Sequence, residues 1–413
     1  VQTAHALIIL GAVTGNIDNP GGIWLGDARG VCPPAWWGWD KLPDDMKAKR
    51  IGTEYPAFST ALSSMHTDLA LDAMETGKPY PCKMAFFMAA NPIAATDMAV
   101  PERWYRVFKK VDFTVVCDLF MTPTASAFAD LFLPVATFAE KDGIVAPYYG
   151  SLQTFIGAIN KAYQVGECKS DDEIMLELGK RLNPKNFPFA NVEELLDWEL
   201  RDTYGLNITF KELREQGWVF PPAVEYFKYE KGKQTLDGSL GFSTPTGKIE
   251  LYSTLFEGWG EDPLPYYVEP PYSPYSTPEI AKEYPLILTT GGRTWPYFHS
   301  EGRQVPLLRE IRPDPIVEIH PDTAEELGIN DGDWVYIENM FGKCKMRAKL
   351  NPGIMTKVVQ ADHGWWFPEK PAEEPILSGV WESNINNLMP HNMIGKLGMG
   401  APYKCMICKV YKA

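Results

Sequence analysis

The sequence lacks any apolar run that approaches the roughly 20 residues of a membrane-spanning helix, so we predict no membrane span in this chain. Basic side chains are also scarce: 39 Lys and Arg residues stand against 53 Asp and Glu residues, and the net charge is −14. Nucleic acids and anionic membranes bind basic surfaces, so this charge argues against both as partners. Seven cysteines are too few for a disulfide scaffold in 413 residues, and their odd number leaves at least one thiol unpaired.

Several common motifs of nucleotide, acyl and metal chemistry are missing as well. The Gly291–Gly292 pair lacks the spacing and the Lys-Ser/Thr pair of a P-loop. Ser300 follows His299, but no G-x-S-x-G turn surrounds it, which argues against a serine hydrolase. Cys405 and Cys408 have the spacing of half a metal site, yet in a predicted strand they would point to opposite faces. We therefore predict buried thiols there and no metal site.

The sequence does contain enough apolar material for folded cores, with 45% hydrophobic and 13% aromatic residues. Its length predicts two to three domains. In the first part, buried strands alternate with short helices, a pattern typical of a parallel sheet in an α/β domain. The predicted segments are Lys83–Ala90, Glu102–Lys110, Phe113–Cys117, Thr124–Ala129 and Leu131–Leu133. Further on, Ser170 and Glu173 form a capping box that predicts a helix ending near Leu182.

Residues 263–285 contain seven prolines, a density that we expect to forbid regular structure and to mark a domain boundary. Beyond it, short strands alternate with Gly-Gly, Asp-Gly and Pro-Gly turns, which predicts a β-barrel. We thus expect the later part of an α/β domain over 1–262, a linker over 263–285 and a barrel domain over 286–413. The predicted barrel strands are Leu286–Thr290, Ile316–Ile319, Trp334–Asn339, Lys343–Leu350, Lys357–Ala361 and Lys404–Tyr411.

Open α/β sheets bind ligands at the carboxyl ends of their strands. Two such ends carry polar side chains, namely Asn91 after one predicted strand and Cys117-Asp118 at the end of another. An Asn or Asp there can contact a ribose or a purine edge. Both could equally be ordinary turn residues.

The richest segment is Thr289–Ser300, where a predicted strand runs into two glycines, an arginine and then aromatic residues. Glycines let backbone amides approach a phosphate, and Arg293 adds a forked donor. The alternative is a turn before a buried aromatic cluster, and His363–Phe367 also has the composition of a core cluster. Glu140–Gly143 is a charged turn or carries a functional lysine.

Several segments taken in order are more specific than any single motif. They are Val115–Ala125, Ala129–Pro134, Ala139–Gly143, Phe242–Ser253, Gly291–Ser300, Ile329–Val335 and Ala401–Lys404. Together they resemble the second half of molybdopterin-dependent oxidoreductases of the dimethyl sulfoxide reductase family, and the resemblance covers essentially all 413 residues. Within that family, His363–Glu369 and Pro263–Tyr267 are similar to the acetylene hydratase, polysulfide reductase and catechol dehydroxylase branches.

This resemblance implies the C-terminal half of an enzyme that holds molybdenum or tungsten in bis(molybdopterin guanine dinucleotide), with a double-psi-like barrel as the dinucleotide-binding domain. Asn91 and Asp118 would contact guanine and ribose, Gly291–Arg293 the pyrophosphate, and Lys404 a phosphate or a pterin carbonyl. The positions that match the family's cofactor contacts are Asn91, Cys117, Asp118, Lys141, Asp171, Thr290, Gly291, Gly292, Arg293, Thr294, His299, Ser300, Trp365, Asn386 and Lys404.

The chain also departs from the family pattern. The N-terminal cysteine cluster and the segment that supplies a protein ligand to the metal are not in this sequence, so we nominate no catalytic and no metal-ligating residue. A [4Fe–4S] cluster is expected only in the missing N-terminal portion. The expected partners are that N-terminal half of the same enzyme and an iron–sulfur electron-transfer subunit.

The implied reaction is redox oxygen-atom or hydroxyl transfer at the metal of the complete enzyme, and this segment alone is expected to be inactive. Two alternatives stay open: a lyase that hydrates its substrate with the same cofactor, and a non-catalytic fragment that binds a cofactor or a partner. The cellular compartment is not predicted, because any export signal would lie upstream.

Overall fold

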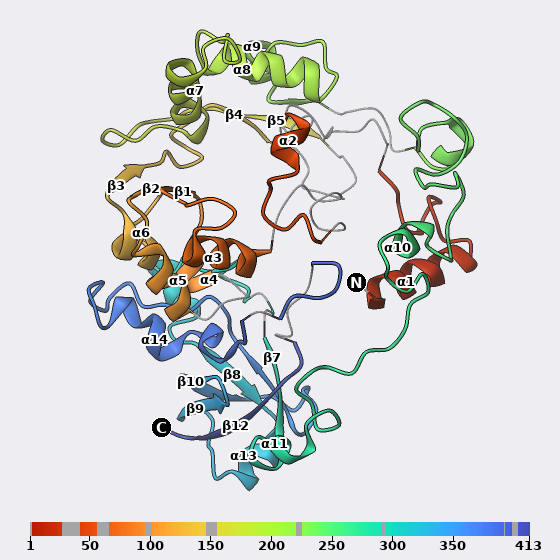
Figure 1. The fold of residues 1–413 in the computed structure, drawn as a ribbon. Helices are drawn as coiled ribbons and strands as arrows, with labels where there is room; N and C mark the ends of the chain where they lie inside the picture. Colours follow the sequence, from red (N-terminus) through yellow and green to blue (C-terminus); the bar gives the residue numbers. More distant parts are fainter. Residues whose placement is uncertain are drawn as a thin grey trace. The chain divides into compact units, whose positions relative to one another are not determined.

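The computed structural model describes residues 2–26, 42–55, 66–95, 101–145, 155–219, 225–290, 292, 294–391, 393–398 and 404–413 (Figure 1). They form two compact units, each built from two stretches of the chain. The first unit comprises Val1–Ala48 and Leu133–Tyr267, and the second comprises Lys49–Phe132 and Val268–Ala413. This division differs from the predicted domain limits because residues 49–132 group with the barrel. Within the described ranges, no helix is both long and apolar enough to cross a membrane.

In the second unit, a small sheet has the strand order β1-β2-β3, and β1 and β2 are parallel. This confirms the predicted parallel α/β pattern. Helices packed on the sheet bury an apolar core that contains stacked aromatic rings. The ring centroids of Trp104 and Phe108 lie 4.8 Å apart. The elements are α3 (Thr67–Thr76), β1 (Met84–Met88), α4 (Pro92–Ala95), α5 (Pro101–Phe108), β2 (Phe113–Asp118), α6 (Pro123–Phe128) and β3 (Leu131–Pro134).

The second unit also contains a closed six-stranded barrel with the order β10-β8-β11-β7-β12-β9 (Figure 1). Its strands alternate buried and less buried residues, as a sheet with one face on a core requires. The pairs β7–β11 and β8–β10 are parallel. The predicted barrel is therefore confirmed, with strands β7 (Leu286–Thr290), β8 (Ile316–Ile319), β9 (Trp334–Asn339), β10 (Gly342–Leu350), β11 (Val358–Ala361) and β12 (Met406–Lys412).

The expectation that residues 263–285 lack regular structure was wrong at one place. Helix α11 (Pro278–Glu283) forms inside this segment, because Pro278 occupies the first turn, where a missing N–H costs no hydrogen bond. The rest of this segment before α11, residues 263–277, is described in the structure and contains no helix or strand. The remaining helices of this unit are α12 (Pro306–Ile311), α13 (Pro321–Glu326), α14 (Val380–Ser383) and the 3₁₀ turns η6 (Leu377–Gly379) and η7 (Ile385–Leu388).

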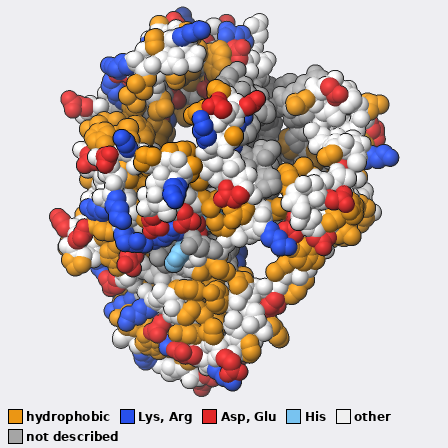
Figure 2. Space-filling model, viewed as in Figure 1, with side chains coloured by type: hydrophobic (Ala, Val, Ile, Leu, Met, Phe, Trp, Pro, Cys, Tyr) orange, Lys and Arg blue, Asp and Glu red, His pale blue; other side chains and the backbone are white. Residues whose placement is uncertain are grey.

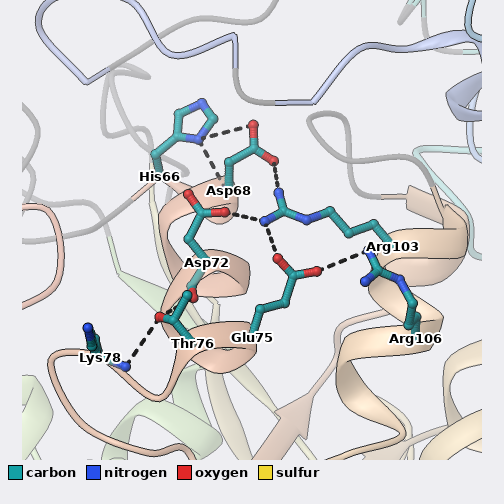
Figure 3. Close-up of polar contacts among 8 residues, drawn as sticks. All are labelled: His66, Asp68, Asp72, Glu75, Thr76, Lys78, Arg103 and Arg106. Carbon is teal, nitrogen blue, oxygen red and sulfur yellow. Dashed lines mark hydrogen bonds and ion pairs between the residues drawn. The ribbon is translucent and has the colours of Figure 1, made fainter.

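A buried arginine joins α3 to α5 beside the small sheet (Figure 3). The Arg103 guanidinium donates to Asp68 at 3.4 Å, to Glu75 at 2.9 Å and to Asp72. Arg106 reaches the second oxygen of Glu75 at 3.0 Å. The hydrogen bond from Arg103 lowers the pKa of Glu75. Because the guanidinium is buried, these carboxylates supply the charge compensation it requires.

The first unit contains a second three-stranded sheet and most of the longer helices. Ser170 Oγ accepts a hydrogen bond from the Glu173 N–H at 3.1 Å, so α7 begins where the capping motif predicts. The elements are α1 (Gln2–Val13), α2 (Asp44–Lys47), β4 (Gly143–Val145), β5 (Ile156–Ile159), α7 (Asp171–Leu182), α8 (Val192–Trp198), the π-helix η4 (Glu199–Thr203), α9 (Phe210–Gln216), β6 (Trp218–Val219), the 3₁₀ turn η5 (Lys228–Lys231) and α10 (Thr254–Gly258).

A buried ion pair links the two stretches of the first unit. The Lys228 ammonium donates to the carboxylate of Asp18, and the Lys228 backbone N–H donates to the same carboxylate at 2.7 Å. Both side chains are almost completely buried. Since a buried charge without a partner is costly, each residue depends on the other, although 210 positions separate them.

The small sheet of the second unit leaves apolar side chains at its surface. Figure 2 shows hydrophobic atoms gathered over this region, and Met84, Phe86, Phe113 and Leu131 are all exposed. Met84 and Phe113 are register partners on neighbouring strands. Exposed apolar side chains are thus present on all three strands of this sheet.

The barrel core sets the stability of the second unit. Leu288 of β7 is fully buried, whereas Leu307 of α12 is 71% exposed. We expect Leu288→Ala to lower the free energy of unfolding of this unit by about 2–5 kcal/mol, because it leaves a cavity, and Leu307→Ala to change it by less than about 0.5 kcal/mol. Urea unfolding followed by barrel tryptophan fluorescence measures both. Equal effects of the two changes would contradict this assignment of the core.

Candidate functional site

Two loops leave the barrel side by side. Strands β7 and β11 are parallel, and their last residues, Thr290 and Ala361, are register partners. The Thr290 hydroxyl donates to the Ala361 carbonyl at 3.0 Å. The loop after β7 and the loop after β11 therefore start from the same end of the barrel, at the carboxyl ends of two parallel strands.

A buried guanidinium holds these loops together. Arg303, with 1% of its surface exposed, donates to the His299 carbonyl at 2.6 Å and to the His363 carbonyl at 3.0 Å. The His299 and His363 rings also meet, with 2.9 Å between Nδ1 and Nε2. Glycine is required at position 364, because its φ is +66° and a Cβ would lie 2.8 Å from the His299 carbonyl oxygen.

Aromatic rings surround the same guanidinium. Arg303 lies 4.6 Å from the centre of the Tyr297 ring and 4.9 Å from that of Trp365. Such cation–π contacts compensate part of the lost hydration. Burial lowers the pKa of Arg303 to about 10, so the group stays charged at neutral pH. Trp365 is fully buried, which agrees with the core-cluster interpretation of His363–Phe367.

A buried carboxylate begins the second loop. Asp362 accepts from the Ile316 N–H at 2.9 Å and from the Thr294 hydroxyl at 3.3 Å, and Arg312 lies 3.5 Å away. Burial raises the pKa of Asp362. Thr294, predicted as a cofactor contact, thus holds the first loop against the second.

Asn91, which follows β1, reaches the loop after β7. Its Oδ1 accepts from the Thr124 hydroxyl at 2.7 Å, and its Nδ2 donates to Ser300 Oγ at 3.1 Å. The Trp366 indole N–H donates to the Ser300 carbonyl at 2.7 Å. The end of the small sheet and the barrel loop therefore meet at Ser300, and the structure brings together Asn91, Thr290, Thr294, His299, Ser300 and Trp365.

The remaining predicted residues of the second unit lie as follows. Cys117 is buried in β2, and Asp118 at the end of that strand accepts from the Leu119 N–H at 2.7 Å. Asn386 is buried in η7, where its N–H donates to the side chain of Asn384 at 3.0 Å. Lys404 is exposed just before β12.

Gly292 is the described part of the predicted phosphate loop, and a Cβ there would lie 2.6 Å from Gln360 Nε2. Gly291 and Arg293 lie outside the described residues. Cys408 is buried in the barrel, where burial strongly raises its thiol pKa, and Cys405 is half-buried.

In the first unit, Lys141 and Asp171 were each predicted as a cofactor contact, and the Lys141 ammonium lies 3.6 Å from the Asp171 carboxylate. The neighbouring Asp172 has a raised pKa because of burial. Burial and the charge of Asp172 raise the pKa of Glu199 to about 6. Glu140, next to Lys141, is buried, and its carboxylate accepts from the Thr137 N–H at 3.1 Å, the Val165 N–H at 2.9 Å and the Cys168 thiol at 3.4 Å. These hydrogen bonds, those from Thr137 above all, lower the pKa of Glu140 to about 2.

Sequence reasoning missed functional residues whose hydrogen-bond partners lie far away in the chain. Arg303, Asp362 and Thr124 each bond to a group that lies 33 to 68 positions away in the chain. Arg303 follows His299-Ser300 closely in the sequence, and this proximity was the one available signal.

Comparisons with known proteins identify the family. A model of the molybdopterin oxidoreductases matches residues 6–181, and a model of the molydopterin dinucleotide binding domain matches residues 286–407. The chain belongs to the molybdopterin oxidoreductase family. The predicted resemblance is thus confirmed, and the second match coincides with the barrel and the two loops described above.

Individual relatives agree with this assignment. Acetylene hydratase from Syntrophotalea acetylenica is 31% identical over 377 residues, which cover 86% of this chain and 49% of that protein. Dopamine dehydroxylase from Eggerthella lenta is 30% identical and covers 100% of this chain and 47% of its own length. The solved structure of acetylene hydratase from Pelobacter acetylenicus matches with a TM-score of 0.80 and 28% identity, over 94% of this chain and 56% of that one. The chain spans about half the length of the curated relatives it matches.

The residues present fit a molybdopterin dinucleotide. Over the part of the chain that the structure describes, Trp365 Nε1 and Arg303 Nε are buried donors without a hydrogen-bond partner in the protein. Gly292 lets the Gln360 amide pack against the first loop, because a Cβ there would lie 2.6 Å from Gln360 Nε2. Donors and a fixed positive charge suit phosphate and carbonyl oxygens. Over the same ranges, no group of three or more His, Cys, Asp or Glu side chains is placed to hold a metal ion.

The hydrogen bonds from Arg303 to the His299 and His363 carbonyls form a clamp between the two loops, and replacing the guanidinium tests this clamp. We expect Arg303→Lys to reduce the protection of residues 294–303 and 362–367 in hydrogen exchange by about 2 kcal/mol, because an ammonium cannot span both carbonyls. Arg106→Lys, at a more exposed ion pair, is the control and should leave these loops unchanged. Retained protection in Arg303→Lys would show that the clamp is not needed.

The raised pKa of Glu199, which lies near Asp172 in the first unit, gives a pH-dependent prediction. The pKa of Glu199 rises from 4.5 to about 6 on folding, so its stabilising effect is complete below pH 4.5 and is lost as the pH rises through 6. At pH 7.5, Glu199→Gln should therefore raise the free energy of unfolding by about 1 kcal/mol after solvent screening, and at pH 4 it should have no effect. Thermal melts at both pH values measure this. Exposed Glu193→Gln on α8 is the control, and a gain at pH 4 would contradict the prediction.

Proposed function

We propose that this chain binds bis(molybdopterin guanine dinucleotide) carrying molybdenum or tungsten, and that the complete enzyme performs redox oxygen-atom or hydroxyl transfer at the metal. The observation that carries the proposal is the loop pair after β7 and β11, clamped by Arg303 within the matched dinucleotide-binding domain. When bound, the cofactor supplies two-electron chemistry at the metal, and the protein orients and insulates it.

The residues of this chain have binding and orienting roles in the proposal. Asp118, at the carboxyl end of β2, accepts from guanine or ribose, and Asn91 fixes the adjacent Ser300 loop. Lys141 supplies positive charge in the first unit, and exposed Lys404 supplies it near β12. Because the net charge is −14, a polyanionic cofactor is attracted by such local groups and by backbone amides rather than by the overall field.

The proposal also assigns roles to parts that this chain does not contain. The relatives are about twice as long, and we propose that a portion corresponding to their other half supplies the protein ligand to the metal and a [4Fe–4S] cluster. An iron–sulfur subunit would then carry electrons. This chain's contribution is the dinucleotide site.

Metal and nucleotide analysis tests the cofactor assignment. We expect the anaerobically purified enzyme to contain one molybdenum or tungsten ion and to release two guanine nucleotides per chain on acid treatment. Mass spectrometry of the metal and chromatography of the nucleotide measure both. A protein with neither metal nor guanine would be the non-catalytic fragment considered above.

A matched pair of aspartates locates the site on β2. Asp118 ends the strand and Asp112 precedes its first residue at the opposite end. We expect Asp118→Ala to weaken guanine retention about tenfold, because a charged acceptor is lost, and Asp112→Ala to leave it unchanged. Equal losses in both variants would argue against a site at the carboxyl end.

A hydratase is the second candidate, because acetylene hydratase is similar to this chain in both sequence and structure. The same dinucleotide site would then serve a non-redox addition of water. The two reactions differ in electron balance: the redox reaction consumes an electron donor in proportion to product, whereas hydration consumes none. Product formation by the loaded enzyme without electron transfer would decide for the hydratase.

A further inference from the structure

Two histidines from different loops share one hydrogen bond at the edge of the barrel. Nδ1 of His299, in the loop after β7, lies 2.9 Å from Nε2 of His363, in the loop after β11. The rings are steeply inclined, at 77°, with centroids 5.2 Å apart. His363 is buried, whereas His299 is partly exposed. One ring is therefore enclosed by protein while the other has access to a ligand.

The backbone around the pair is fixed independently of the imidazoles. Arg303 bonds to the carbonyl oxygens of both histidines, at 2.6 and 3.0 Å. The contact of Gly364 with the His299 carbonyl leaves no room for a side chain. Asn91 and Trp366 hold the next residue, Ser300. The separation of the two rings is thus set by contacts that involve both loops.

The charges facing the pair come from both loops. The Arg303 guanidinium lies against both carbonyls, and the Glu301 carboxylate accepts from the His299 backbone N–H at 3.0 Å. The carboxylate of Asp362, the residue before His363, accepts hydrogen bonds from Thr294 and Ile316 and forms an ion pair with Arg312. A single hydrogen bond between the two rings requires one ring nitrogen to donate and the other to accept.

We propose that His363 is a positioning residue that sets the tautomer of His299, so that His299 presents Nε2–H as a donor to an oxyanion or carbonyl of the bound dinucleotide. His363 Nε2–H donates to His299 Nδ1, which leaves the single proton of His299 on Nε2. This inference rests on the proposed function, because the acceptor character of the ligand selects this tautomer over its reverse. No proton is consumed or released in the arrangement.

Nitrogen NMR of the ¹⁵N-histidine-labelled enzyme tests the tautomer directly. The sequence contains six histidines, so single His→Gln variants can assign the signals. We expect His299 in the Nε2–H tautomer in the wild type and in His363→Gln, whose amide can donate to Nδ1. In His363→Phe we expect a mixture of tautomers. A wild-type His299 in the Nδ1–H tautomer, or an unchanged tautomer in His363→Phe, would overturn the proposal.

Cofactor retention is the second measurement. We expect guanine per chain after gel filtration to fall about fivefold in His363→Phe, to recover in His363→Gln, and to stay unchanged in His320→Phe, which alters only the N-cap of α13. Equal losses in Phe and Gln variants with unchanged melting would contradict a hydrogen-bonding role. If the wild type holds no guanine, the proposed function fails. If it holds guanine but His299 is in the Nδ1–H tautomer, only the positioning role of His363 fails.

Discussion

The Arg303 guanidinium carries its positive charge in a place that solvent hardly reaches, and the geometry of the candidate site depends on it. The carbonyls of His299, Glu301 and His363, two aromatic faces and the field of Asp362 replace its hydration. None of these partners alone would compensate for burial of a full charge. Because the compensation comes from both barrel loops, the loops must close around the charge together. The position of His299, Ser300 and Trp365 then follows from one electrostatic requirement.

The same requirement explains how an acidic chain can hold a polyanion. The long-range field of a protein with a net charge of −14 repels phosphate, whereas a fixed guanidinium and oriented N–H groups act only at short range. A preorganised site of this kind loses little free energy to reorganisation when it binds. The two family domains, the barrel and the loop clamp therefore form a consistent picture of a dinucleotide-binding chain.

Local sequence patterns predicted the strands well and the site only in part. Alternating apolar residues give β7, β8 and β9 with the predicted limits, because burial of one face decides a strand locally. Helix α11 was missed because proline density outweighed the favourable first-turn position of Pro278. The Asp18–Lys228 pair and the Arg303 clamp could not be read from sequence, since their partners meet only after folding. Lys141 and Asp171 were nominated through family resemblance, and no local pattern predicts their ion pair.

The position of β12 in the barrel has a consequence for biosynthesis. This strand pairs with β7 and β9, yet it follows both in the chain, and β7 ends 116 residues before β12 begins. At ribosomal rates, β7 waits on the order of ten seconds for this neighbour. During that time an apolar strand edge is available to other chains. Closure of the barrel is thus a late event in the synthesis of this chain, and it waits for its last strand.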